Sequence, residues 1–471
     1  MPTLPIPINL GPNRSIDEVG MIGYNAFLYD GFVDGAGNVN RRPGLVQFSD
    51  LSTAAGVDGL YWWDRQSKLI AVCNGNIFSI NQNGVATDLG GDDLQAGYPV
   101  YFADFNTVLY ACNGTRIVAI PASGTPAYIA DADAPTTVRA IAELDTYLLA
   151  LKDDTEQVWY PDAGDPTNWQ GLFVSAQYKP DLAKMLGVRN DIIEIVGTQS
   201  IEGWRNDGST PFIKESQYTV DHGIIAPHSF RYCTGFDGSG NWYWLSSTRQ
   251  IVKMVGRQVI PIAPESLNKY LQTFSTVSDA IGGECNINGT PHYVLTFPTE
   301  NKTIAINLGI GTWSEFGYWN SGNASHDKWR GISYAPATSW NLQLVGDHSN
   351  GKIYKLDPTV YQDNSSTLNT LIRTANIDRG TLSERKFPKA IYLWLKKSNV
   401  ADIADAAQMM VKWRDQGRTA WKTERTVNLG YVGDTIFRGK ITDLGSYYSR
   451  QYQFSITDNA PLVFVRAEEE F

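Results

Sequence analysis

Two stretches of this chain, LIAVCNGNIFSI (Leu69–Ile80) and LYACNGTRIVAI (Leu109–Ile120), repeat one pattern. In each, an Asn-Gly pair separates two apolar runs, and the two pairs lie 39 residues apart. Asn-Gly between apolar strands is the strongest short signal for a β-hairpin, because a type I′ turn needs positive φ at both central residues. We therefore predict a hairpin in each stretch. A third is expected in LQLVGDHSNGKIYKL, around Asn350-Gly351.

The chain between residues 51 and 365 divides into seven such units, each a short apolar strand followed by a hairpin and a polar stretch. Their spacings run from 38 to 53 residues, and the units are anchored near Gly59, Gly97, Val138, Gly187, Ser229, Gly282 and Gly331. Units of about 40–50 residues with four strands are typical of propeller blades. A large β-sandwich with irregular hairpins is the alternative.

The two ends of the chain differ from this repeat. Residues 1–50 form an N-terminal arm ending in RRPGLVQF, and we expect its strand to close the propeller, because closure hides sheet edges. Beyond residue 365 the repeat stops, and apolar residues such as Met409, Val411 and Trp413 alternate with polar ones. The predicted fold is therefore all-β: a seven-bladed β-propeller over 51–365 and an additional C-terminal antiparallel β-sandwich over 366–471.

The composition suits a chain with a large core and many aromatic contacts. Of its 471 residues, 42% are apolar and 19% charged, with 14 Trp, 24 Tyr and 18 Phe. Aromatic residues at this density bring large flat surfaces to sheets and interfaces. A net charge of −10 without Lys/Arg runs excludes a free-standing nucleic-acid-binding module. Four cysteines without a CxxC pair indicate neither a disulfide framework nor a zinc site, so we expect them to be buried hydrophobes.

Signals for export and catalysis are also missing from the sequence. The N-terminus, MPTLPIPINLGPNRS, has no basic-then-apolar signal pattern, and no run of about 18 apolar residues occurs, so we predict no secretion and no membrane insertion. GxSxG, HExxH and Walker A motifs are absent, and the five histidines fall in different units. We therefore predict a protein that is not an enzyme, with no catalytic residues, metal or cofactor.

A group of basic residues in the C-terminal region allows two interpretations. Arg414, Arg418, Lys422 and Arg425 cluster in one predicted hairpin. They form either an ordinary solvated strand face or, if a cyclic oligomer repeats them around a pore, a collar lining a DNA channel. A collar of that kind touches several phosphates without reading sequence.

The order of several segments resembles one protein family. These segments are the entry RRPGLVQF, the central QYTVDHGIIAPHSF with GNWYWLSS and QIVKMVGRQVIPI, then ESLNKYLQTF, NGTPHYVLTFP and GTWSEFGYW, and finally LGSYYSRQYQFSITDNAPLVFVRAEEE. In this order they resemble the packaged-DNA stabilisation proteins of short-tailed phages, the tail hub or nozzle subunits. The resemblance runs over most of the chain, but it identifies no gate or pore-constriction residue.

The resemblance implies a structural virion protein of the phage tail that is assembled in the host cytoplasm. Such a protein forms a homohexamer below the portal and its adaptor ring, extends the DNA channel, helps to retain packaged double-stranded DNA and offers attachment surfaces for fibres, tailspikes or a tail needle. Two rival hypotheses remain open at this point. One is a carbohydrate-binding or carbohydrate-cleaving propeller that acts on host surface polysaccharide, and the other is a monomeric scaffold that binds peptides.

Overall fold

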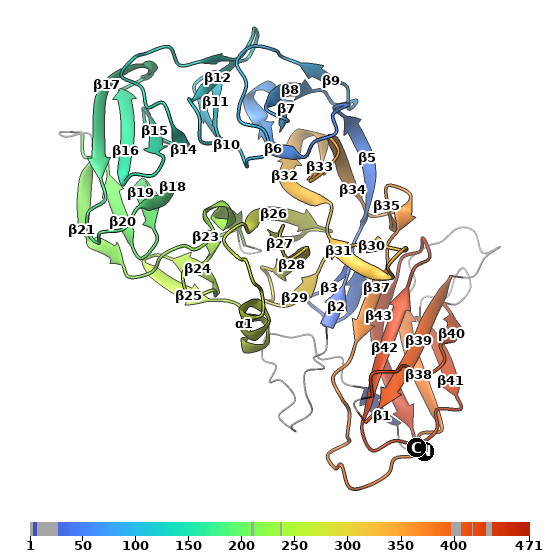
Figure 1. Ribbon diagram of the computed structural model, residues 1–471. Coiled ribbons are helices and arrows are strands. Elements are labelled where there is room, and N and C mark those ends of the chain that lie inside the picture. The colour runs from blue at the N-terminus through green and yellow to red at the C-terminus, as the bar shows by residue number, and fades with distance from the viewer. Residues whose placement is uncertain are drawn as a thin grey trace.

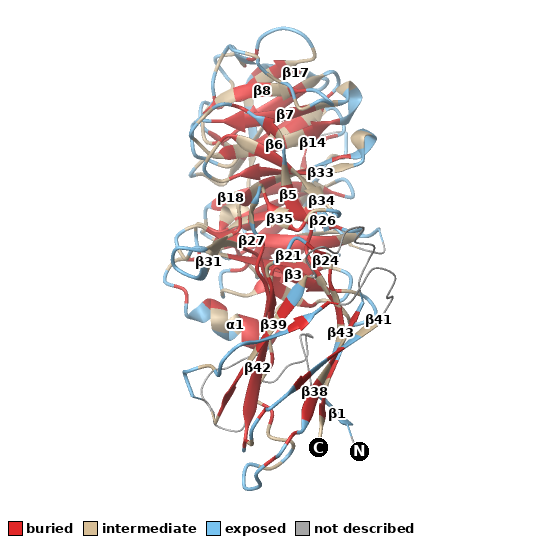
Figure 2. Cartoon of the chain, turned by 90° about the vertical axis from the view of Figure 1, so that its right-hand side faces the viewer, coloured by how far each residue is buried: buried red, intermediate tan, exposed pale blue. Residues whose placement is uncertain are grey.

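The computed structural model describes residues 3–6, 27–208, 212–235, 238–396, 407–416, 418–429 and 436–471. A ring of β-sheets forms the larger part of the molecule, and a β-sandwich lies below it (Figure 1). Figure 2 shows the same two parts from the side, with buried residues running through the strands of both. The predicted fold class, an all-β propeller with an additional C-terminal sandwich, is confirmed.

Seven antiparallel blades of four strands make up the ring. The first four blades contain β6 (Val57–Trp63), β7 (Lys68–Cys73), β8 (Asn76–Ile80) and β9 (Ala86–Asp88); β10 (Tyr101–Phe105), β11 (Val108–Cys112), β12 (Val118–Pro121) and β13 (Ala127–Tyr128); β14 (Val138–Leu144), β15 (Tyr147–Lys152), β16 (Gln157–Asp162) and β17 (Asp165–Ser175); and β18 (Ala183–Arg189), β19 (Ile192–Gly197), β20 (Ile201–Arg205) and β21 (Ile213–Val220). The first strand of each blade lies nearest the centre, so these strands line the middle of the ring (Figure 1).

The remaining three blades complete the ring. They contain β22 (Arg231–Thr234), β23 (Gly240–Leu245), β24 (Ile251–Val255) and β25 (Gln258–Pro261); β26 (Ile281–Ile287), β27 (Thr290–Phe297), β28 (Lys302–Asn307) and β29 (Trp313–Glu315); and β32 (Gly331–Ala337), β33 (Leu342–Asp347), β34 (Lys352–Asp357) and β5 (Gly44–Asp50). Between blades lie α1 (Glu265–Gln272) and the hairpin of β30 (Gly317–Asn320) and β31 (Ser325–Lys328). The last blade thus takes its outer strand from the N-terminal part of the chain, where β5 pairs antiparallel with β34.

The Asn-Gly pairs that mark the repeat form different turns. Asn74 and Gly75 have φ of 53° and 86°, so a type I′ turn joins β7 to β8, as predicted. At the second pair only Gly114 has a positive φ, and the Asn113 side chain instead bonds to both the carbonyl and the amide of Gln95. A longer loop therefore connects β11 to β12. At the third pair, Asn350-Gly351, likewise only Gly351 has a positive φ.

The C-terminal sandwich consists of two sheets, and both include strands from the N-terminal part. One sheet has the order β3 (Gly31–Val33), β4 (Val39–Arg41), β43 (Val463–Glu470), β38 (Ala390–Lys396) and β41 (Ile436–Thr442), with β1 (Thr3–Ile6) beside β43. The other continues from blade six through β2 (Phe27–Tyr29), β37 (Thr370–Arg373), β42 (Arg450–Ile456), β39 (Gln408–Asp415) and β40 (Arg425–Asn428). Short strands β35 (Gln362–Asp363) and β36 (Ser366–Thr367) extend the last blade. The division at residues 50 and 365 stays a prediction.

The RRPG stretch lies where the N-terminal strands, the last blade and the sandwich meet. Arg42 is fully buried, and its Nε donates to Asp30 at 2.7 Å while Nη1 and Nη2 donate to the two carboxylate oxygens of Asp363 at 2.9 and 2.5 Å. Arg41 donates to the carbonyls of Leu368, Asp458 and Ala460. Two arginines therefore join three segments that are distant in sequence.

The prediction about the cysteines can be compared with the structure. Cys73, Cys112, Cys233 and Cys285 are buried and unpaired, which confirms the interpretation as small hydrophobes. Among the residues described, no helix is both long and apolar enough to cross a membrane.

Candidate functional sites

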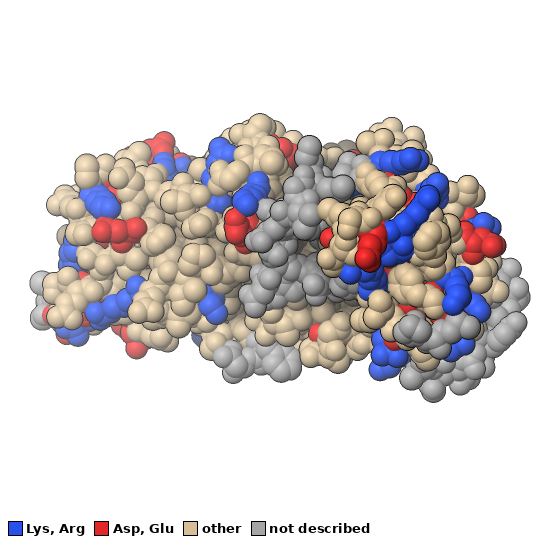
Figure 3. Space-filling view, turned by 90° about the horizontal axis from the view of Figure 1, so that it is seen from below, with Lys and Arg blue, Asp and Glu red and all other residues tan. Residues whose placement is uncertain are grey.

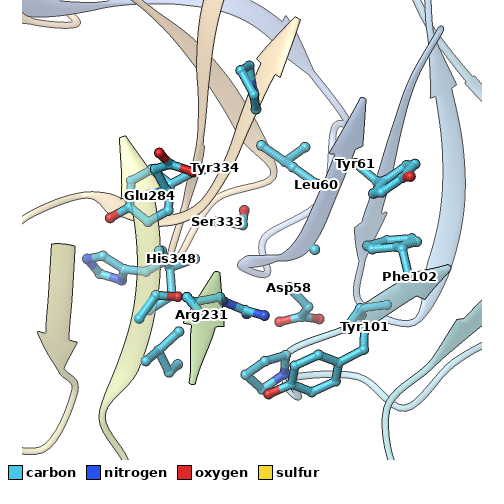
Figure 4. Close-up of a pocket in the computed structure, with 18 of the residues that line it drawn as sticks. Asp58, Leu60, Tyr61, Tyr101, Phe102, Arg231, Glu284, Ser333, Tyr334 and His348 are labelled. Atoms are coloured by element: carbon cyan, nitrogen blue, oxygen red, sulfur yellow. The ribbon is translucent and has the colours of Figure 1, made fainter. Parts of the chain in front are cut away.

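A cavity of about 690 Å³ opens at the centre of the ring (Figure 4). Strands β6, β10, β22, β26 and β32 line it, so five blades contribute side chains. Its polar lining includes Asp58, Arg231, Glu284 and His348, and its aromatic lining includes Tyr61, Phe102 and Tyr334. The cavity therefore combines polar and charged side chains with aromatic surface.

Two carboxylates that are distant in the sequence line this cavity. The Asp58 carboxylate accepts a hydrogen bond from the amide of Gly97 at 3.0 Å, and partial burial raises its pKa to about 6. Glu284 accepts from the amide of Thr234 at 2.9 Å, and burial also raises its pKa. In Figure 4 the two side chains project from different walls. Sequence reasoning did not find this pair, because only ring closure brings residues so distant in sequence to one cavity.

A basic and aromatic group borders the same cavity. Arg231 lies over the Tyr101 ring, 5.1 Å from its centroid, and its Nε donates to the carbonyl of Gly282 at 2.8 Å. The Tyr101 hydroxyl and His228 Nδ1 form a 2.8 Å hydrogen bond. Burial lowers the pKa of His228 to about 4, with smaller contributions from the charges of Arg231 and Arg139. His228 is therefore neutral at pH 7.

The cavity offers binding chemistry more readily than covalent chemistry. Tyr61 and Phe102 stack with their centroids 5.3 Å apart and present apolar surface beside the polar side chains. Aromatic faces beside polar groups suit a polar ring such as a sugar. Among the described residues, no three of His, Cys, Asp and Glu lie close enough together to hold a metal ion.

The predicted basic residues lie on the sandwich and do not share one surface. Arg414 on β39 is buried at 6% exposure, and its Nε donates to Gln451. Arg418 and Lys422 are exposed in the connection between β39 and β40. Arg425 is exposed on β40 and pairs across the strands with Val411, so it projects from the same side of the sheet as that core residue. Arg414 lies three residues after Val411 on β39 and therefore projects from the other side. Their role in lining a channel stays a prediction.

Two further cations accompany Arg414, and sequence reasoning missed them. Arg373 on β37 and Lys412 on β39 approach the Trp421 ring to 5.1 and 5.8 Å, and Arg414 approaches it to 4.6 Å. Figure 3 shows Lys and Arg more densely gathered on the sandwich, at the right of that view, than on the ring. The alternation around Lys412 was visible in the sequence, but the partner Arg373 comes from a strand near residue 370.

Together, the closed ring of four-stranded blades and its central cavity define a β-propeller protein. A family model described as "Bacteriophage P22 Gp10, beta-propeller" matches residues 29–361, and the chain belongs to this Phage_stabilise family. It is thus a structural protein of the phage tail that stabilises packaged DNA, and it is a component of the virion. The match spans the ring and its closing strand, and the resemblance found in the sequence is confirmed.

Solved structures that are similar to this chain include virginiamycin B lyase from Staphylococcus aureus, at 12% identity and TM-score 0.44 over 66% of this chain and 98% of the lyase. The N-terminal domain of Nup159 matches at 9% identity and TM-score 0.39 over 70% of this chain and 98% of that one. No curated protein matches the chain.

Proposed function

We propose that the protein forms a homohexameric ring, the tail hub or nozzle of a short-tailed phage, below the portal-adaptor complex. The ring extends the DNA channel, retains packaged double-stranded DNA until ejection and offers attachment surfaces for fibres, tailspikes or a tail needle. The observation that carries this proposal is the family match across residues 29–361. Assembly takes place in the host cytoplasm.

Two apolar patches at different places on the chain support ring assembly. The blade-edge patch lies on β17 and the chain after it, and it consists of Leu172, Phe173, Tyr178 and Leu182, each exposed by 42–45%. The foot patch lies in the loops before β38 and before β42, and it consists of Leu382, Phe387 and Tyr448, with Phe387 exposed by 65%. A cyclic ring needs two different complementary surfaces on each subunit. β17 and the foot of the sandwich lie at opposite ends of the molecule, so the two patches are distinct surfaces (Figure 1).

The first experiment is the native mass of the purified protein, alone and with its adaptor-capped portal. Six copies of the 52.2 kDa chain give a species of about 313 kDa. Phe387→Ser is expected to reduce that species, whereas Val85→Ser, at an exposed site of 58% in blade one, leaves it unchanged. A protein that stays at 52 kDa in both conditions would contradict the ring.

A second candidate function, carbohydrate binding or cleavage on host polysaccharide, has one observation in its favour. The central cavity combines Asp58 and Glu284 with the Tyr61–Phe102 stack. The test is turnover of host polysaccharide by the protein and by Asp58→Asn and Glu284→Gln, with the exposed Glu384→Gln as control. We expect no turnover by any of them. Turnover that only the cavity variants lose would replace the structural function by an enzymatic one.

A further inference from the structure

The central cavity of the ring holds charges of both signs that do not pair with one another. In the view of Figure 4 the Arg231 side chain extends toward Asp58, and Glu284 projects from another wall. Among the described residues, Arg231 forms an ion pair with no carboxylate, and neither acid forms one with a cation. Elsewhere in the ring such groups are paired: Arg139 with Asp153, Arg189 with Glu194 and Arg330 with Asp347.

Contacts with neutral groups hold the Arg231 guanidinium in place. Its Nε donates to the carbonyl of Gly282 at 2.8 Å, and the guanidinium lies over the Tyr101 ring, 5.1 Å from the centroid. Among the described residues, Nη1 and Nη2 have no hydrogen-bond acceptor. A planar guanidinium whose outer nitrogens are free can donate two parallel hydrogen bonds to a carboxylate or a phosphate. Arg231 is therefore oriented for an anionic group that enters the cavity.

A β-bulge presents the Asp58 side chain. The register of β6 against β7 skips this residue, so Asp58 lies outside the ladder, and its carboxylate accepts from the amide of Gly97 at 3.0 Å. Strand β14 has a bulge at the corresponding position, which is Arg139, and that side chain pairs with Asp153. The same structural position thus carries a neutralised charge in blade three and an unpaired one in blade one.

Aromatic rings line the same cavity as these charges. Tyr61 and Phe102 stack with their centroids 5.3 Å apart. Aromatic faces attract ammonium groups, most strongly where water is excluded. With its histidine neutral, the described lining carries one net negative charge, from two carboxylates and one guanidinium. Carboxylates beside aromatic faces form a suitable site for an ammonium group.

Holding half-buried charges apart costs free energy, and a ligand that pairs with them recovers it. An amine alone would leave Arg231 unpaired, and an anion alone would leave Asp58 unpaired. A neutral sugar brings hydroxyl groups but no charge. The cavity volume of about 690 Å³ lies in the range of sites for small molecules. A ligand that carries both charges is therefore the best match to the lining.

We propose that the central cavity binds a zwitterion that carries an ammonium group and a phosphate or carboxylate a few bonds apart. The acidic group pairs with Arg231, and the ammonium group pairs with Asp58 beside the Tyr61–Phe102 stack. Phosphoethanolamine, either free or as the headgroup of a lipid, has this chemistry. The site lies within one subunit, so the inference goes beyond the hub and does not depend on the hexamer. It differs from the sugar candidate because it requires both charges.

The test is titration calorimetry of the full chain with O-phosphoethanolamine and with its two halves, ethanolamine and inorganic phosphate. The whole ligand is expected to bind about tenfold or more tightly than either half, because each charged contact contributes a factor of that size. Arg231→Gln should reduce the affinity for the whole ligand to about that of ethanolamine. Asp58→Asn should reduce it to about that of phosphate. Asp58→Asn keeps the shape of the side chain, so it tests the site even if Arg231→Gln does not fold.

Two substitutions outside the cavity serve as matched controls. Arg257 is exposed and makes the same kinds of contact as Arg231, since it lies 5.1 Å from the Tyr218 centroid and donates to the carbonyl of Gln217. Asp88 is exposed and, like Asp58, accepts from a backbone amide. Arg257→Gln and Asp88→Asn should keep the wild-type affinity. The Tm of every variant shows whether it is folded.

Vesicles distinguish the two sources of the ligand. Binding to vesicles that contain phosphatidylethanolamine, but not to vesicles of phosphatidylglycerol, would assign the site to a lipid headgroup. Binding of soluble O-phosphoethanolamine alone would assign it to a free zwitterion, and both results support the proposal.

Three results would overturn the proposal. They are no binding of O-phosphoethanolamine, equal affinity for the whole ligand and one of its halves, and an affinity that Arg231→Gln and Asp58→Asn leave unchanged. Binding of a neutral monosaccharide in place of the zwitterion would also overturn it and assign the cavity to the sugar candidate. A species of 313 kDa would still support the hub in each of these cases, so the two proposals fail separately.

Discussion

Replacing Arg42 by methionine tests whether the RRPG stretch joins the ring to the sandwich. The substitution keeps an apolar stem of similar length but removes the hydrogen bonds to Asp30, Asp363 and the carbonyl of Gly317. Arg42, Asp30 and Asp363 are all fully buried. The variant therefore leaves two buried carboxylates without the cation that compensates their charge. Removal of one partner from a buried pair costs about 3–5 kcal/mol. We expect a loss of that size, measured as a lower urea midpoint at unchanged slope.

A matched control and a pH series isolate the cause. Arg65→Met removes an ion pair with Asp104 in which the Arg65 side chain is 59% exposed, and it should cost about 0–1 kcal/mol. Burial raises the pKa of Asp30 even beside Arg42. Without Arg42 the Asp30 carboxyl favours its protonated form, so the deficit of the variant is fully present at neutral pH and shrinks as pH falls. A loss below about 1 kcal/mol, equal to that of the control, would refute the reasoning.

Three shorter predictions concern other parts of the fold. Gly44→Ala would bring a Cβ onto the carbonyl of Gln362, so it should lower the free energy of unfolding in urea by about 1–3 kcal/mol. The control Gly35→Ala meets open space and should change that free energy by no more than about 0.5 kcal/mol. Equal effects of the two substitutions would contradict the clash. His228 has a lowered pKa, so as pH falls the unfolded chain binds a proton at this residue before the native protein does, and the native protein loses stability between about pH 6.5 and 4. His228→Gln should flatten the decline of Tm over that range. An unchanged profile of Tm against pH would show that His228 does not cause the decline. Deletion of residues 366–471 should leave a propeller that keeps a cooperative β-sheet transition in circular dichroism. The deletion also removes the strands that pair with the N-terminal ones, so the truncated protein should self-associate through the uncovered strands. Loss of the transition would disprove an independent propeller.

Ring architecture was accessible from the sequence because its signals are local. Apolar strand runs, turn residues and a spacing of about 45 residues are repeated in each blade, and they predict the same unit wherever they occur. Individual turns were less predictable. Asn74-Gly75 forms the expected tight turn, whereas Asn113 uses its side chain to hold the Gln95 backbone, a contact with a segment outside the hairpin.

Candidate sites were harder to predict, because each combines residues distant in the chain. Asp58 and Glu284 line one cavity only because blades one and six belong to the same closed ring. Arg414 and Arg425 look like one cluster in the sequence, yet strand alternation puts them on opposite sides of the sheet. Arg373 joins Arg414 through the cross-strand register of β37, β42 and β39.

By itself, then, the sequence determined the all-β class, the number of blades and the family resemblance, since these depend on repeated local patterns and on segment order. The tertiary structure alone decided which charges are buried, paired or gathered. The two arginines of RRPG illustrate the difference: nothing near them in sequence marks them as buried, and their partners Asp363, Leu368 and Asp458 lie more than three hundred residues away. Burial and pairing depend on which strands become neighbours, and that is settled only when the ring and the sandwich close around the N-terminal strands.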